Sequence, residues 1–221
     1  MSDPDLSATP LPADTVGLLE GLASTRAIRR YTDDPVPPEA LRAMLFAATR
    51  APSGSNRQPF RFVVLTDGPK ALEAKRLIAE AGQRIWSNKR EHDGYDAGSG
   101  VVDDSPKARM ARTMQHYVDH FASAPVLVLP CLVRYREPTP LEGASIFPAC
   151  QNLLLAARAL GLGAVLTTQQ FFLPGEFEKV LGLPSTVTLA AIIPVGWPTG
   201  KFGPTQRPDA KSVVSWDRYD T

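Results

Sequence analysis

The sequence has only two cysteines and three histidines among its 221 residues. Cys131 and Cys150 stand in apolar surroundings without CxxC spacing, so we expect two buried free thiols rather than a disulfide framework. His116 and His120 have the i, i+4 spacing of a metal-binding pair, but Tyr117 occupies the position of the glutamate in HExxH and no third ligand is evident. We therefore expect no metal site.

The sequence also lacks an excess of either charge. Its 24 Lys and Arg residues balance 23 Asp and Glu residues, and the basic residues are scattered, which argues against nucleic acid or an anionic membrane as a partner. No apolar run approaches the roughly 20 residues of a membrane helix. Residues 1–13 are polar and rich in proline, unlike a signal peptide. We expect a cytoplasmic protein that acts on small molecules.

Three familiar motifs are missing: GxGxxG, GxxxxGK[ST] and GxSxG. Their absence argues against a Rossmann dinucleotide site, a P-loop and a hydrolase nucleophile elbow. The composition, 43% hydrophobic and 21% charged, is typical of a globular protein. We expect one domain over residues 1–221, with a loose N-terminus at 1–13.

Hydrophobic periodicity and turn residues predict helices between apolar strands. The expected helices are a short one capped by Asp14, one opened by Pro37 and Pro38, and those within 69–84, 107–121, 143–160 and 171–183. Extended segments are expected at 60–65, 126–133, 164–168 and 186–195, with Pro130 indicating an edge position or a bulge. This order predicts an α+β or α/β layer architecture with helices on both faces of a central sheet.

Two segments are expected to be irregular. Residues 87–105 collect glycines and acidic residues, which favours a mobile loop that serves as a lid. Residues 196–221 are rich in Pro, Gly and charge and cannot form a core of their own. They nevertheless carry four aromatic residues that should dock on another surface, such as that of a partner subunit: Trp197, Phe202, Trp216 and Tyr219.

Three polar segments adjoin this core and are candidates for a binding site. In the first, Ile28 and Tyr31 are candidates for burial, while Arg26 and Arg29 suit a phosphate and a neighbouring developing anion. A solvated basic face is the alternative. The second segment, 51–59, offers donors and acceptors that match the edge of a planar heteroaromatic ring, although a plain turn is the alternative. Its polar residues include Ser53, Ser55, Asn56 and Gln58.

The third segment, 164–169, is a small-residue strand end that follows Gly161 and Gly163. These two glycines are able to end the preceding helix through a left-handed cap. Small residues let such a strand lie close against a flat ring. Taken alone, this is the weakest of the three indications.

In this order and spacing, the segments resemble the nitroreductase family of FMN-dependent oxidoreductases. Residues 26–31 (RAIRRY) are similar to its RRSxRxF signature, and residues 52–60 (PSGSNRQPF) are similar to its PSGxNxQPW segment. Further matches lie at 161–164 and 194–198, followed by Arg207-Pro208. The resemblance implies an α+β fold with a central mixed sheet flanked by helices. It also implies a domain-swapped homodimer with an extended C-terminal arm, 196–221, and two FMN sites built from both subunits.

The resemblance also assigns roles to residues. Arg26 and Arg207 would hold the FMN phosphate, and Arg29 would support the reduced flavin at its N1/O2 edge. Ser53, Gly54, Ser55 and Asn56 would contact the ribityl chain and the pyrimidine edge. Leu166, Thr167 and Thr168 would line the ring near N5, and Ala27 belongs to the same cofactor-binding set. The flavin carries the chemistry, so no protein side chain is expected to be catalytic.

The expected activity is a ping-pong reductase that takes hydride from NADPH or NADH and reduces a nitroaromatic compound or quinone. Arg84, Lys89 and Arg90 favour NADPH, with a solvated basic face as the alternative. Thr25 and Ala27 stand where the family usually has Arg and Ser, so one cofactor contact is lost. Because residues 166–168 are closer to iodotyrosine deiodinase-like members, reductive dehalogenation is an alternative. A second alternative is a flavin-binding or flavin-consuming protein without reductase turnover. The simplest alternative is a dimer that binds no cofactor.

Overall fold

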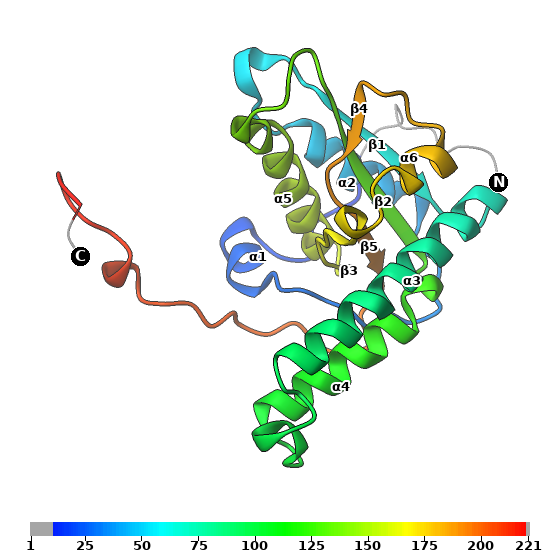
Figure 1. The fold of residues 1–221 in the computed structure, drawn as a ribbon. Helices are drawn as coiled ribbons and strands as arrows, with labels where there is room; N and C mark the ends of the chain where they lie inside the picture. The colour runs from blue at the N-terminus through cyan, green and yellow to red at the C-terminus, as the bar shows by residue number, and fades with distance from the viewer. Residues whose placement is uncertain (1–10, 220–221) are drawn as a thin grey trace.

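The computed structural model describes residues 11–219 of the chain (Figure 1). Of the loose N-terminus predicted at 1–13, residues 1–10 lie outside the described residues, and so do residues 220–221 of the predicted arm. The helices are α1 (Leu18–Ser24), α2 (Pro38–Thr49), α3 (Pro69–His92), α4 (Pro106–Asp119), α5 (Gly143–Ala159) and α6 (Glu176–Leu181). The strands are β1 (Phe60–Leu65), β2 (Val126–Val133), β3 (Gly163–Ala164), β4 (Val187–Leu189) and β5 (Ile193–Gly196).

The five strands form one sheet in the order β1-β2-β5-β3, with β4 also pairing with β2. Every strand pairing among the described residues is antiparallel. Within residues 11–219 the sheet is therefore antiparallel, whereas the resemblance implied a mixed sheet. Strands that run in the same direction, such as β4 and β5, each pair with β2 and not with each other. The prediction of an α+β fold is confirmed.

Pro130 lies in the middle of the sheet, so the predicted edge position is wrong. The alternative, a bulge, is confirmed. Val128 pairs with Ile193, and Cys131 pairs with Leu189. Two residues of β2 lie between these pairs, whereas three residues lie between them on the opposing segment 189–193. The extra residue bulges out opposite Pro130, which has no N–H to offer a ladder hydrogen bond. This bulge also divides the single strand predicted here into β4 and β5.

Helices cover both faces of the sheet, as predicted (Figure 1). α2 and α5 pack on one face, where Met44, Cys150 and Leu153 are fully buried. α3, α4 and α6 supply the core of the other face, which includes Phe121 and Phe177. Burial of each such side chain contributes roughly 1.5–3 kcal/mol to the free energy of unfolding.

The two cysteines lie on opposite sides of the sheet, Cys150 in the α2–α5 core and Cys131 in the α3–α4 core. Both are buried free thiols, as predicted. Burial raises the pKa of each thiol to about 12, because a thiolate loses its hydration in an apolar core. Both are therefore protonated at neutral pH and serve as core residues.

The helix that the sequence predicts at 69–84 continues as α3 to His92, so the predicted mobile loop 87–105 is shorter than expected. The extension forms because Trp86 is buried and its ring packs against Tyr95, beyond the end of the helix. An ion pair of 2.7 Å between Arg90 and Asp96 also holds the turn that joins α3 to α4. The first part of the predicted lid segment, up to His92, is therefore helical.

α1 begins differently from the prediction. Gly17 precedes the helix and no side chain caps it, so Asp14 is not the cap. Leu18 and Leu19 are exposed by 70% and 80%, because the helix contacts the body through Gly21 and Ser24 instead. α1 therefore presents an apolar face that one chain leaves uncovered.

Candidate functional site

The basic segment 25–31 is built into the sheet edge as an extended strand-like chain. The amide of Ile28 donates to the carbonyl of Ala164 at 3.1 Å. A Cβ on Gly163 would stand 2.5 Å from the Ile28 side chain, so only glycine permits this approach. Tyr31 approaches Gly196 in the same way, at 2.9 Å from where a Cβ would lie. Both side chains are half-buried against these glycines, so the predicted burial is partial.

Tyr31 locks this segment through its hydroxyl. The hydroxyl donates to the carbonyl of Ile28 at 2.6 Å and lies 3.2 Å from the carbonyl of Pro194. Burial raises the pKa of Tyr31 well above its usual value, and the neighbouring Tyr117 adds to the increase. The hydroxyl is therefore a permanent donor that fixes the backbone beside Arg29.

Arg26 and Arg29 line one cavity of about 420 Å³. Arg207, from the start of the C-terminal segment, lies in the wall of the same cavity, and none of the lining residues is acidic. We call it the arginine cavity. Its other lining residues are Leu22, Thr25, Ala27, Gln151, Leu154, Ala164, Val165, Leu166 and Thr205. Three guanidinium groups beside an apolar wall suit a ligand that combines an anionic group with a flat apolar body.

The C-terminal segment reaches this cavity because it is tied to the end of α1. The amide and the hydroxyl of Thr205 both donate to the carbonyl of Ala23, at 2.9 and 3.1 Å. The Phe202 ring lies 4.2 Å from the guanidinium of Arg158, which is buried on α5. These contacts place Arg207 in the lining of the cavity that Arg26 also lines, although the two are far apart in the sequence.

Five of the predicted cofactor residues therefore come together around the arginine cavity: Arg26, Ala27, Arg29, Leu166 and Arg207. Thr167 and Thr168 do not line it. Thr167 exchanges two backbone hydrogen bonds with Ile192, at 2.8 and 2.9 Å, and its side chain turns inward. Gly161 has a positive φ of 79° and supplies the predicted left-handed cap. Gly163 does not, because it lies in β3 against the basic segment.

The second predicted segment forms a tight 3-10 turn, Gly54–Asn56, between α2 and β1. Ser55, Asn56 and Gln58 all have positive φ, between 49° and 52°. Left-handed backbone at non-glycine residues is strained and tends to occur at functional sites. We call residues 53–56 the 53–56 loop.

The 53–56 loop lies apart from the arginine cavity within one chain. It lines a separate cavity of about 160 Å³. The amide of Gly54 donates to the Oγ of Ser145 at 3.1 Å, and the Oγ of Ser53 accepts from the amide of Gln58 at 2.9 Å. Ser55 and Asn56 are exposed. One chain thus carries the two halves of the predicted site on different surfaces.

Tyr117 is a residue that the sequence analysis missed as part of the site. The guanidinium carbon of Arg29 lies 5.7 Å from the centre of the Tyr117 ring, within cation–π range. The Tyr117 hydroxyl is buried and faces the buried hydroxyl of Thr167. Burial raises the pKa of Tyr117, although the positive charge of Arg29 partly opposes the increase. The apolar pattern of 107–121 predicts that Tyr117 is buried, but no sequence signal links it to Arg29.

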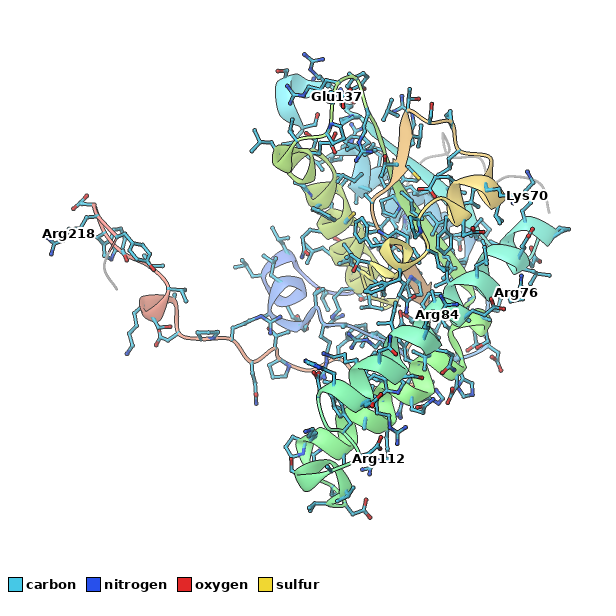
Figure 2. All side chains as sticks on the ribbon, in the orientation of Figure 1. Lys70, Arg76, Arg84, Arg112, Glu137 and Arg218 are labelled. Atoms are coloured by element: carbon cyan, nitrogen blue, oxygen red, sulfur yellow. The ribbon has the colours of Figure 1, made fainter. Side chains whose placement is uncertain are left out.

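The residues that favoured NADPH are largely engaged elsewhere. Lys89 pairs with Asp93 at 2.7 Å and Arg90 pairs with Asp96. Figure 2 shows Arg84 on the α3–α4 side of the molecule, and Arg84 lines a third cavity, of about 350 Å³, rather than the arginine cavity. The arrangement favours the solvated basic face, which was the alternative.

The ring of His116, on α4, stacks on that of His120, the residue after α4 ends, with 4.1 Å between the ring centroids. Within residues 11–219, no cluster of three or more His, Cys, Asp or Glu side chains is arranged to hold a metal ion. No helix of the same residues has both the length and the apolar character needed to cross a membrane.

Comparison with known proteins finds relatives that match most of the chain. The Nitroreductase family profile matches residues 22–197. Iodotyrosine deiodinase 1 of Rattus norvegicus is 32% identical over 189 residues, which cover 81% of this chain but only 61% of the rat protein. The NADH dehydrogenase of Thermus thermophilus is 30% identical over 198 residues, which cover 86% of this chain and 91% of that protein.

A solved structure gives the same result. A protein from Desulfovibrio desulfuricans, determined in complex with FMN, superimposes with a TM-score of 0.63 at 27% identity, covering 92% of this chain and 98% of that one. The match with the family profile spans the basic segment, the 53–56 loop and all residues that line the arginine cavity except Thr205 and Arg207.

Proposed function

The chain belongs to the nitroreductase family, and from that premise we propose that it binds FMN and transfers reducing equivalents from NADPH or NADH to a small electron-poor acceptor. The observation that carries this proposal is the arginine cavity, where Arg26, Arg29 and Arg207 converge beside the apolar β3 wall. The FMN found in the Desulfovibrio desulfuricans structure has the matching composition, a phosphate joined to a flat ring.

Each arginine has a distinct role in this proposal. Arg26 and Arg207 hold the phosphate, because guanidinium groups donate paired hydrogen bonds and keep their charge at all physiological pH values. Arg29 is less exposed than Arg26 and Arg207, and its guanidinium lies over the ring of Tyr117. Its cation stabilises negative charge that develops on the ring edge during reduction. When bound, FMN supplies the hydride chemistry, so the protein contributes binding, orientation and charge.

The remaining residues complete the site across a homodimer. The 53–56 loop lies on a different surface from the arginine cavity, so we propose that each cavity receives this loop from a second copy of the chain. The exposed apolar side chains of the chain support an interface: Leu18, Leu19, Phe46, Phe147, Val213 and Trp216. Figure 1 shows the C-terminal segment leaving the body, as an arm exchanged between two subunits would.

The proposed acceptors are nitroaromatic compounds and quinones. A second candidate activity, reductive dehalogenation of halogenated aromatics, is favoured by the likeness to iodotyrosine deiodinase 1 of Rattus norvegicus and by Thr167 and Thr168 at the strand end. This chain spans less than two thirds of that protein. Both activities use the same cavity and the same reduced cofactor.

One experiment separates these possibilities. Purified protein loaded with FMN is mixed anaerobically with NADPH or NADH, and the absorbance of the oxidised flavin is followed. Loss of this absorbance, followed by its return on adding a nitroaromatic compound or quinone, supports the reductase. Return only with a halophenol supports the dehalogenase. Failure to bleach with either nicotinamide contradicts the proposed reductase and favours a flavin-binding protein without this turnover.

A further inference from the structure

Arg158 is a buried cation in the last turn of α5, outside the lining of the arginine cavity. Its side chain is only 9% exposed. The carboxylate of Glu20 lies 3.8 Å from its guanidinium but is itself 67% exposed, so this ion pair balances the charge only in part. Because burial of an unpaired charge is costly, the guanidinium needs further partners.

These further partners come from two segments that are distant in the sequence. On α1, the Oγ of Ser24 accepts from the Nε of Arg158 at 2.8 Å and donates to the carbonyl of Glu20 at 2.7 Å. On the C-terminal segment, the centre of the Phe202 ring lies 4.2 Å from the guanidinium carbon, within cation–π range. One side chain therefore joins α5, α1 and the C-terminal segment.

The C-terminal segment leads from this contact into the arginine cavity. Phe202 stands five positions before Arg207, which lines the cavity. Between them, Thr205 also lines the cavity and is hydrogen-bonded to the end of α1. The contact between Arg158 and Phe202 is thus placed to determine where the chain delivers Arg207.

Arg207 needs such an anchor because of its own charge. It is exposed and shares the cavity with Arg26 and Arg29, and none of the lining residues is acidic. Cations that face one empty cavity repel one another, so a loosely held Arg207 would move away from it. A segment that is already held in place also loses less conformational freedom when a ligand binds.

We propose that Arg158 is a positioning residue for the cofactor site: it anchors Phe202 to α1 and α5, and thereby holds Arg207 where it reaches the phosphate of FMN. The inference rests on the proposed binding of FMN. Arg158 acts on the ligand through Arg207, because it does not itself line the cavity. A role limited to the end of α5, where a cation is favourable, would stabilise the fold without affecting the ligand.

Arg158→Met removes the cation but keeps a long apolar side chain. Replacing a buried ion by an apolar residue is often neutral for stability, so the melting temperature of the FMN-free protein should change little. The Kd for FMN should rise about three- to tenfold, because binding must then order the C-terminal segment. Phe202→Leu removes the other side of the contact and should give a similar increase.

The most discriminating measurement repeats Arg158→Met in the Arg207→Ala background. If Arg158 acts through Arg207, its substitution should change the Kd less than about twofold once Arg207 is gone. Two residues that act independently would show the same increase in both backgrounds. Phe202→Leu, at a half-buried position, gives the same comparison if Arg158→Met does not fold.

Lys75→Met is the matched control. Lys75 is also a buried cation, but it lies on α3, where its Nζ donates to the carbonyl of Ala124 at 2.8 Å. The substitution leaves this carbonyl unpaired, so it should lower the melting temperature. It should leave the Kd for FMN unchanged, because Lys75 does not contact the C-terminal segment or line the cavity.

Fluorescence titration gives the Kd for FMN, and thermal unfolding without FMN gives the melting temperature. If Arg158→Met binds FMN like the wild type, or weakens binding equally with and without Arg207, the positioning role is wrong while FMN binding stands. If Lys75→Met raises the Kd as much as Arg158→Met, loss of stability is responsible and the role is again wrong. A wild type that takes up no FMN overturns the proposed function, and the inference with it.

Discussion

The two halves of the proposed cofactor site are held by one chain in opposite ways. The arginine cavity is anchored at depth: Ile28 and Tyr31 lie against Gly163 and Gly196 with no space for a Cβ. The 53–56 loop is exposed and strained, and the Oγ of Ser145 holds its Gly54 amide. Strain in a native loop persists when surrounding contacts stabilise it. This contrast is what the proposed homodimer would need, in which the anchored cavity of one chain receives the exposed 53–56 loop of a second copy.

The largest expected effect concerns the deep half. Arg29→Ala should slow flavin reduction by NADPH about 100-fold, because the cation that stabilises developing charge is lost. FMN binding should weaken much less, since Arg26 and Arg207 remain. Anaerobic stopped-flow absorbance measures the rate. Arg30→Ala is the control, because Arg30 is exposed and does not line the cavity. Equal rates of flavin reduction in Arg29→Ala and the wild type would show that Arg29 does not stabilise this developing charge.

The second largest expected effect is on FMN binding rather than on the rate of flavin reduction. Arg207→Ala should raise the Kd for FMN about 10- to 100-fold, as expected for losing a charge-assisted hydrogen bond to phosphate. Fluorescence titration at two salt concentrations measures the loss, which should be larger at low salt. The exposed Lys201, in the same C-terminal segment but outside the cavity wall, provides the control as Lys201→Ala. A Kd unaffected by Arg207→Ala contradicts phosphate binding here.

The anchoring of the deep half is tested by stability. Gly163→Ala places a Cβ 2.5 Å from Ile28 and should lower the free energy of unfolding by about 1–3 kcal/mol. Gly200→Ala meets no atom within 4 Å and should leave stability almost unchanged. Urea denaturation gives both values. Similar stabilities for the two variants would show that the basic segment is held loosely.

The smallest expected effect concerns the exposed half. Ser145→Ala removes the acceptor for the amide of Gly54, at a cost of about 0.5–1.5 kcal/mol that water partly offsets. FMN affinity should fall only a few-fold. Ser123→Ala deletes a comparable exposed hydroxyl bond to His120 and serves as the control in the same titration. If Ser145→Ala weakens binding as much as Arg207→Ala, the two halves do not differ as described.

Local patterns predicted the elements whose cores are formed nearby. β1 at Phe60–Leu65 and α2 behind Pro37 follow the prediction closely, because apolar runs and helix-opening prolines act locally. The resemblance to the family, drawn from short motifs, is confirmed by the match over residues 22–197. The convergence of Arg26 and Arg29 on one cavity is also consistent with the sequence analysis.

Features set by tertiary contacts were not predictable. The β4–β5 division depends on which residues face Pro130 across the sheet, and the extension of α3 depends on a contact between Trp86 and Tyr95. The contact of Tyr117 with Arg29 joins α4 to the basic segment across the α3–α4 core. The separation of the 53–56 loop from the arginine cavity likewise appears only when the chain is folded.

We propose that FMN binds in an arginine cavity completed by a second copy of the chain. Sedimentation velocity of the protein with FMN, followed at the flavin absorbance, tests it directly. We expect bound flavin to sediment with a species of twice the 23.9 kDa chain mass. We also expect Arg207→Ala to release flavin from this species. Flavin sedimenting with a single chain at full affinity, or no uptake of flavin at all, would contradict it.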